Sequence, residues 1–142
     1  MTRIDFYTGV SDRLRAAAAL CGKAVARGLT VLVASPDEAT SQALSRVLWS
    51  QPPTGFVPHV PAGHPLAAVT PVVLDHQLAQ LDRHQVLVNL RDPAPECFSR
   101  FERLLEIVGR DEADRLAARA RYRHYRDRGY ALNSHDMAGK GL

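Results

Sequence analysis

The stretch Leu29-Thr30-Val31-Leu32-Val33-Ala34-Ser35-Pro36-Asp37-Glu38 decides the fold class of this chain of 142 residues. Residues 29–34 form an apolar run, which is typical of a strand that is buried on both faces of a sheet. Ser35, Pro36 and Glu38 then match a helix start, with serine as the N-cap, proline at the first helical position and glutamate at the third. A buried strand that leads directly into a helix is typical of α/β domains, so the stretch predicts that class.

The same alternation continues on both sides of this stretch. The helix that starts at Pro36 continues to about Trp49. The sequence predicts further strands at residues 4–8, 56–59, 72–75 and 85–90. It also predicts further helices: one that is capped by Ser11 or Asp12 and ends at Gly28, one at 96–106 and one at 112–128. Residues 105–108 fit a strand as well as a helix end. We therefore expect one three-layer α/β/α domain, residues 1–133, around a mostly parallel sheet, followed by a flexible tail, residues 134–142.

Composition excludes several classes of protein. Hydrophobic residues make up 46% of the chain and charged residues 23%, which is usual for a globular protein, and no apolar run approaches the length of a membrane helix. The N-terminus lacks the layout of a signal peptide, so we expect a cytoplasmic protein that does not bind membranes. Cys21 and Cys97 fit reduced thiols in the core, and neither has further ligands at zinc spacing.

Motifs for catalysis or cofactor binding are missing from the sequence. The turn after the first predicted strand, residues 8–12, has one glycine and no lysine, and neither GxGxxG nor GxxxxGK[ST] occurs anywhere. There is no GxSxG motif for a nucleophilic serine. His59 and His64 flank a loop and could form a metal pair, but no HExxH pattern accompanies them, which favours ordinary surface histidines. The sequence thus predicts a protein without catalytic site, cofactor or metal.

Positive charge is concentrated in residues 115–128. This segment contains six arginines and one acidic residue, Asp127, and carries +5, whereas the whole chain carries +3, so the other residues sum to −2. A local basic feature on an otherwise slightly acidic chain favours a local acidic partner.

The arginines and one tyrosine share a face of the last predicted helix. That face consists of Arg115, Arg119, Tyr122, Arg123 and Arg126, and the adjoining face, which we expect to pack on the sheet, of Ala113, Leu116, Ala117 and Ala120. Arginine offers a planar fork for carboxylates and tyrosine an apolar wall, so the first face predicts binding of an acidic peptide with a hydrophobic anchor, or of a C-terminal carboxylate. Two alternatives to peptide binding remain open. The arginine face could simply be solvated, or it could bind single-stranded nucleic acid, because arginine binds phosphate and tyrosine stacks on bases.

A second candidate surface surrounds Trp49 and Phe56. Tryptophan and phenylalanine are common anchors of protein interfaces, and two prolines, Pro52 and Pro53, separate them here. The alternative is a tryptophan that is buried in the core at a helix end.

Three motifs of this chain are familiar in combination. They are Asp5-Phe6-Tyr7, then Leu48-Trp49 followed by Phe56-Val57-Pro58-His59, and the closing Ala118-Arg119-Ala120-Arg121-Tyr122-Arg123-His124-Tyr125-Arg126 with Gly129-Tyr130-Ala131-Leu132-Asn133. With these motifs the whole chain resembles the chi subunit family of the bacterial DNA polymerase III holoenzyme.

The resemblance implies a non-catalytic adaptor with an α/β fold that lacks a phosphate-binding loop. Chi subunits bind the acidic, phenylalanine-ended C-terminal tail of single-stranded DNA-binding protein (SSB), and they join the clamp loader through the psi subunit. The SSB-tail positions of the family correspond here to Val108, Arg115, Arg119, Tyr122 and Arg123, and the psi-binding positions to Trp49 and Phe56. Arg119 is expected to hold the terminal carboxylate, with Tyr122 and Val108 beside the phenylalanine ring.

These observations together predict an accessory protein of DNA replication. It would connect the clamp loader to DNA that is coated with SSB, so its contact with single-stranded DNA would be indirect. Direct binding of single-stranded DNA through the same helix is the first alternative, and a nucleotide-dependent enzyme is the second.

Overall fold

The computed structural model describes residues 1–50, 57–78 and 85–139. Within these residues one sheet contains the strands β1 (Arg3–Val10), β2 (Val31–Ala34), β3 (His59–Pro61), β4 (Val72–Asp75), β5 (Val86–Asn89), β6 (Arg103–Gly109) and β7 (Leu132–Asp136). Their order is β3-β4-β2-β5-β6-β1-β7, and neighbouring strands run parallel. The predicted parallel sheet is therefore confirmed.

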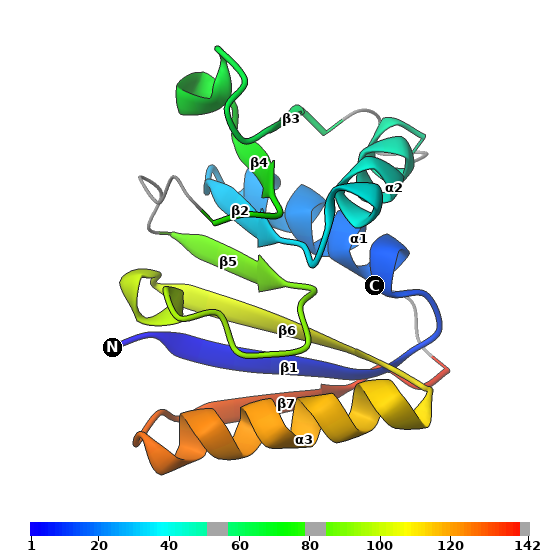
Figure 1. Ribbon diagram of the computed structural model, residues 1–142, viewed down its shortest axis with the longest axis vertical. Coiled ribbons are helices and arrows are strands. Elements are labelled where there is room, and N and C mark those ends of the chain that lie inside the picture. The colour runs from blue at the N-terminus through cyan, green and yellow to red at the C-terminus, as the bar shows by residue number, and fades with distance from the viewer. Residues whose placement is uncertain (51–56, 79–84, 140–142) are drawn as a thin grey trace.

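Helices cover both faces of this sheet. The helices are α1 (Arg13–Ala26), α2 (Glu38–Trp49) and α3 (Glu112–Asp127), and short 3-10 turns span Ala67–Val69 and Phe98–Arg100. One apolar cluster joins α1 and α2 to the sheet and a second joins α3 to the opposite face, and Figure 1 shows the two helix layers on either side of the strands. This arrangement confirms the predicted three-layer α/β/α class.

The central strand β2 confirms that the opening stretch is buried on both faces. Val31 and Val33 belong to the cluster beneath α1 and α2, whereas Leu32 and Ala34 belong to the cluster beneath α3. Alternate side chains of one strand thus fill two cores, which explains why the strand has no polar face.

The N-cap of α2 differs from the prediction. Asp37, and not Ser35, caps the helix, because its carboxylate accepts a hydrogen bond from the backbone nitrogen of Thr40 at 2.7 Å. Ser35 is fully buried, and its hydroxyl bonds the Ser41 hydroxyl instead. Proline at position 36 therefore precedes the cap, and the helix begins two residues later than predicted.

The helix predicted at 96–106 was wrong, and the alternative of a strand at 105–108 was nearer the structure. Only Phe98–Arg100 forms a 3-10 turn, and β6 begins at Arg103. The apolar residues of β6 divide between the two cores, with Leu105 and Ile107 on one side and Leu104 and Val108 on the other. Glu106 is buried among them, and this charge within the strand obscured its apolar pattern.

The prediction of a flexible tail at residues 134–142 was wrong for residues 134–136. Residues 132–136 form β7, which pairs with β1 at the edge of the sheet. His135 Nε2 donates a hydrogen bond to the Asp5 carboxylate at 2.9 Å, and the His135 ring stacks on Tyr7 with centroids 4.7 Å apart. The polar sequence Leu-Asn-Ser-His-Asp gave no sign of a strand, because an edge strand needs few apolar side chains.

The packing face of α3 was predicted incorrectly as well. The buried residues of this helix are Asp114, Ala118, Arg121 and Tyr125, whereas Leu116 is 53% exposed. Polar side chains face the sheet because Glu106 lies beneath the helix and bonds both Arg121 and Tyr125. The bounds of α3 agree with the prediction to within one residue, and Gly129 lies just after the C-cap Arg128 with a φ of 86°, a conformation that favours glycine.

Candidate functional site

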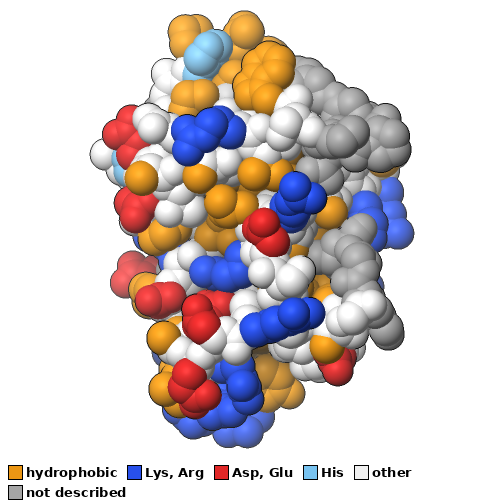
Figure 2. Space-filling view, turned by 90° about the vertical axis from the view of Figure 1, so that its right-hand side faces the viewer, with side chains coloured by type: hydrophobic (Ala, Val, Ile, Leu, Met, Phe, Trp, Pro, Cys, Tyr) orange, Lys and Arg blue, Asp and Glu red, His pale blue; other side chains and the backbone are white. Residues whose placement is uncertain are grey.

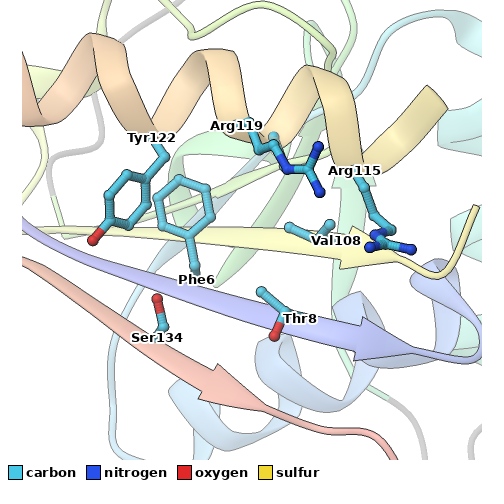
Figure 3. A pocket seen from close by; sticks show the side chains of 8 residues that line it. Phe6, Thr8, Val108, Arg115, Arg119, Tyr122 and Ser134 are labelled. Carbon is cyan, nitrogen blue, oxygen red and sulfur yellow. The ribbon is translucent and has the colours of Figure 1, made fainter. Parts of the chain in front are cut away.

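A pocket lies between α3 and the strands at one end of the sheet. We name it the α3 pocket; its volume is about 210 Å³, and it is lined by Phe6, Thr8, Val108, Arg115, Ala118, Arg119, Tyr122 and Ser134. Strands β1, β6 and β7 supply one wall and α3 supplies the other (Figure 3). Four residues that sequence reasoning assigned to the SSB tail, Val108, Arg115, Arg119 and Tyr122, are therefore neighbours in space.

The base of the α3 pocket is apolar. Phe6, Val108 and Ala118 are all buried, with exposed fractions of 2%, 3% and 6%. The rings of Phe6 and Tyr122 lie side by side in Figure 3, with centroids 5.4 Å apart and a tilt of 57°. Aromatic rings prefer such tilted arrangements, so this pair forms a stable wall against which another ring can pack.

Two arginines border the apolar base. Figure 3 shows the guanidinium groups of Arg115 and Arg119 extending from α3 toward Val108. Both side chains are exposed, and within the described residues neither forms an ion pair or a side-chain hydrogen bond. Each guanidinium therefore keeps its hydrogen-bond donors available for a carboxylate.

The buried network beneath α3 fixes the orientation of the pocket. Glu106 accepts hydrogen bonds from Arg121 Nε at 2.9 Å, from Asn89 Nδ2 at 3.0 Å and from the Tyr125 hydroxyl. Arg121 Nη1 also donates to the backbone oxygen of Asp92 at 2.8 Å. Arg121 and Tyr125 flank Tyr122 along the helix, so these bonds set the helical rotation that directs Tyr122 toward Phe6.

Burial dominates the electrostatics of this network. Burial raises the pKa of Glu106 above the usual carboxyl value, and the attraction of Arg121 and the hydrogen bonds from Tyr125 and Asn89 only partly oppose it. Burial and the Glu106 charge also raise the pKa of Tyr125. The hydrogen bonds to Glu106 offset part of the cost of burying its carboxylate, and they favour the observed position of α3 on the sheet.

The start of α3 is held by a second polar cluster. Asp114 accepts a hydrogen bond from the backbone nitrogen of Gly109, and its carboxylate lies 3.4 Å from Arg13 Nε. Asp111 caps the helix through the backbone nitrogen of Asp114 at 2.7 Å. These contacts join the end of β6 to the first turn of α3, next to Arg115.

The remaining predicted residue of this site, Arg123, lies on α3 but does not line the pocket. It is exposed one residue beyond Tyr122, where it can contact only a ligand that extends out of the pocket. Sequence reasoning missed four lining residues, Phe6, Thr8, Ala118 and Ser134. Phe6 and Thr8 alternate with Asp5 and Tyr7 on the first predicted strand, which could have placed them together on one face of the sheet.

The second predicted surface is described only in part. Trp49 is the last residue of α2 and is 66% exposed, which excludes the alternative of a buried core tryptophan. Its ring meets the His59 ring edge-on, with centroids 6.0 Å apart. Phe56 lies outside the described residues.

The face at the carboxyl ends of the strands carries side chains of both charges among the residues that the structure describes. Figure 2 looks onto this face and shows acidic and basic side chains interspersed with apolar ones. Groups of three or more His, Cys, Asp or Glu that could hold a metal ion do not occur among the residues that the structure describes. In that same part of the chain no helix is long and apolar enough to cross a membrane.

Comparisons with known proteins agree with the resemblance. The family model "DNA polymerase III chi subunit, HolC" matches residues 1–133. The chain is 37% identical over 141 residues to DNA polymerase III subunit chi of Pseudomonas aeruginosa, which covers 96% of this chain and 98% of that protein. It is 32% identical over 108 residues to the Escherichia coli protein of that name, covering 75% and 74%, and 29% identical over 111 residues to that of Haemophilus influenzae, covering 78% and 77%. Because the family match spans nearly the whole chain, the protein belongs to the DNA polymerase III chi subunit family.

Proposed function

We propose that this chain is a non-catalytic accessory subunit of the replicative DNA polymerase in the cytoplasm, and that its α3 pocket binds the acidic C-terminal tail of SSB. One observation supports this proposal most strongly. Two arginines without ion pairs among the described residues, Arg115 and Arg119, border a buried apolar base. A C-terminal phenylalanine offers the complementary pair, namely a carboxylate and an aromatic ring on the same residue.

Recognition would combine two kinds of contact. The terminal carboxylate would accept a bidentate pair of hydrogen bonds from Arg119, because a planar guanidinium matches the geometry of a carboxylate. The phenylalanine ring would pack on Val108 and against Tyr122. Arg115 and Arg123 would attract the acidic residues that precede the phenylalanine, which would speed association more than it strengthens the final complex.

A second surface would connect the chain to the clamp loader through psi. The exposed indole of Trp49 supports this part of the proposal, because large exposed aromatic side chains are frequent anchors of protein interfaces. Phe56 is assigned to the same surface by the family resemblance. Trp49 belongs to α2, which packs on the other face of the sheet from α3, so the two partners would not compete for space.

Direct binding of single-stranded DNA is the second candidate function. Its support is the exposed series Arg115, Arg119, Arg123 and Arg126 along α3, next to the partly exposed ring of Tyr122. Against it, Arg126 lies 3.6 Å from Asp127, and Arg121 is used internally by Glu106. The remaining basic track is short compared with the footprint of a sequence-independent DNA binder.

A salt series separates the two candidates. The intact protein is titrated with an acidic peptide that ends in Asp-Phe, with the same peptide carrying a C-terminal amide, and with an oligonucleotide. The proposal expects binding of the free-acid peptide, clear weakening by amidation, and little binding of the oligonucleotide. Tight oligonucleotide binding with a steep logarithmic salt dependence, together with no peptide binding, would replace the proposal by the second candidate.

A further inference from the structure

One edge of the sheet is built from a stretch of sequence without charged residues. Residues 47–74 contain no Asp, Glu, Lys or Arg, although these residue types make up 23% of the chain. The described part of this stretch, residues 47–50 and 57–74, includes the end of α2, the edge strand β3, the 3-10 turn Ala67–Val69 and most of β4. We name it the uncharged edge. It lies at the opposite end of the sheet from β7 (Figure 1).

Three large apolar side chains of the uncharged edge are exposed. The exposed fractions are 66% for Trp49, 55% for Leu66 and 79% for Val69. Elsewhere in the described part of the chain, the exposed large hydrophobic residues are Met1 and Leu116. Single exposed apolar side chains are common on protein surfaces, but several within one region without charge are typical of an interaction site.

These three side chains surround the start of β3 and β4. The Trp49 ring meets the ring of His59, whose register partner in β4 is Val72, and Val69 precedes Val72 by three residues. The backbone nitrogen of Val69 donates a hydrogen bond to the backbone oxygen of Leu66 at 3.1 Å. Side chains three positions apart on a 3-10 turn eclipse each other, so Leu66 and Val69 project from the same side of the turn. The exposed apolar surface thus extends from the end of α2 around β3 to this turn.

The space-filling view agrees with this arrangement. Figure 2 shows apolar and histidine side chains together at the top of the molecule, the end at which Figure 1 places β3 and the 3-10 turn. Charged side chains follow only below this region in the same view.

The edge strand β3 favours contacts through side chains over the addition of a further strand. Pro61 has no backbone N–H, and its oxygen already accepts a hydrogen bond from the backbone nitrogen of His64 at 3.2 Å. Pro58, directly before β3, lacks a donor as well. Prolines at a sheet edge hinder pairing with another strand, whether of a second copy or of a different protein. A partner would therefore pack on the apolar side chains.

The absence of charge determines the kind of partner. A charged group of the partner would lose its hydration at this surface without gaining an opposite charge, which is costly. Apolar groups gain from burial there, and the centres of protein interfaces are depleted of charged residues and enriched in aromatic ones. Salt screens contacts between exposed charges, such as those expected of Arg115 and Arg119, but it does not screen apolar contacts.

We propose that Trp49, Leu66 and Val69 form one docking surface for a partner protein whose contact surface is apolar and uncharged. The inference rests on the proposed function, which assigns Trp49 to psi, and it adds two things to that assignment. Leu66 and Val69 of the 3-10 turn contribute to binding of the same partner, and the affinity depends little on salt.

Calorimetry of the full-length protein with the psi subunit of the same bacterium tests the proposal. The double variant Leu66→Ser, Val69→Ser should bind psi about tenfold or more weakly, a loss that is usual for anchor residues of an interface. Leu116→Ser changes a leucine of similar exposure on α3, so it is the matched control and should bind psi within about twofold of the unmodified protein. The affinity of the unmodified protein should change by less than about threefold between about 0.1 and 1 M salt.

A folding control accompanies these variants. Because the substituted side chains are exposed and lie outside the α3 pocket, the melting temperature and the binding of the Asp-Phe peptide should stay unchanged. A lower affinity for psi then reports on the docking surface and not on the stability of the fold.

Four outcomes would contradict the proposal in different ways. If Trp49→Ala weakens psi binding and the double variant does not, the proposal is wrong while the assignment of Trp49 to psi stands. If the unmodified protein does not bind psi, both the assignment and the proposal fail. A steep loss of affinity with salt would overturn the uncharged character of the contact. Self-association in sedimentation that the double variant abolishes would show that a second copy of the chain covers the uncharged edge.

Discussion

At the scale of single residues, two arginines of the same helix have opposite roles. Arg121 is 2% exposed and ion-paired with Glu106, whereas Arg119, two positions earlier, is exposed and lines the α3 pocket. In the sequence alone the two arginines are indistinguishable, because both add a positive charge to the basic segment 115–128. The structure separates them because the buried carboxylate of Glu106 lies beneath only one of the two positions.

The buried arginine leads to a prediction about stability. Arg121→Ala should lower the free energy of unfolding by about 3–5 kcal/mol, because it removes the ion-pair partner of the buried Glu106. Arg123→Ala, an exposed arginine of the same helix, is the matched control and should change it by less than about 0.5 kcal/mol. Urea denaturation followed by circular dichroism measures both values.

A paired substitution shows whether the lost charge pairing is the cause. Glu106→Gln combined with Arg121→Met removes both charges, and it should recover part of the stability that Arg121→Ala loses. A double variant that is less stable than Arg121→Ala would indicate that packing, and not an unpaired charge, dominates at this position.

At the scale of elements, the strand β7 closes one wall of the α3 pocket. It contributes Ser134 to the lining and pairs with β1, which contributes Phe6 and Thr8. The α3 pocket therefore depends in part on Ser134, which the sequence analysis assigned to a flexible tail.

Truncation tests this role of β7. A chain that ends at Ala131 lacks all of β7, and its free energy of unfolding should fall by about 1–3 kcal/mol, with weaker binding of the Asp-Phe peptide. A chain that ends at Met137 keeps β7 and should match the full-length protein in both thermal denaturation and peptide binding. Equal stability of the two truncated chains would contradict the structural role of β7.

The elements also show where prediction from sequence succeeded and failed. The strand β2 and the bounds of the helix α3 were predicted to within two residues, because the apolar run of β2 and the glycine that follows α3 are local signals. The strands β6 and β7 were mispredicted because their identity depends on distant partners: Glu106 in β6 is explained only by Arg121 and Tyr125, and β7 only by β1. Among the residues that line the α3 pocket, Arg115, Arg119 and Tyr122 of the helix were predicted from helical periodicity. Phe6, Thr8 and Ser134 were not predicted, because only the order of the strands in the sheet brings them next to the helix.

At the scale of the whole molecule, the first and last strands are joined through one buried carboxylate. Asp5 is fully buried, bonds Arg103 at 3.0 Å and His135 at 2.9 Å, and lies 3.4 Å from Arg3. Burial alone would raise the pKa of Asp5, but the hydrogen bonds from His135 and Arg103 and the charges of Arg3 and Arg103 outweigh it. The pKa of Asp5 therefore lies below its ordinary value of 3.8.

This lowered pKa makes stability depend on pH in a defined direction. A carboxyl group whose pKa is lower in the folded state stabilises the fold above its unfolded pKa, and this contribution disappears as the pH falls through the folded pKa. The stability difference between the unmodified protein and Asp5→Asn should be constant above about pH 5 and should shrink as the pH falls below 3.8. Thermal denaturation of both proteins between pH 7 and the acid limit measures it, and a difference that grows with acidity would contradict the sign of the pKa shift.

The central claim is that the α3 pocket recognises a C-terminal carboxylate beside an aromatic ring, and calorimetry of Arg119→Ala tests it most directly. Arg119→Ala should weaken binding of an acidic peptide that ends in Asp-Phe by about 1.5–3 kcal/mol, the contribution of a charge-assisted hydrogen bond. Arg126→Ala, on the same helix but outside the pocket, should change the affinity by less than about 0.5 kcal/mol. Equal affinity of the Arg119→Ala protein and the unmodified protein for this peptide would contradict the assignment of the pocket.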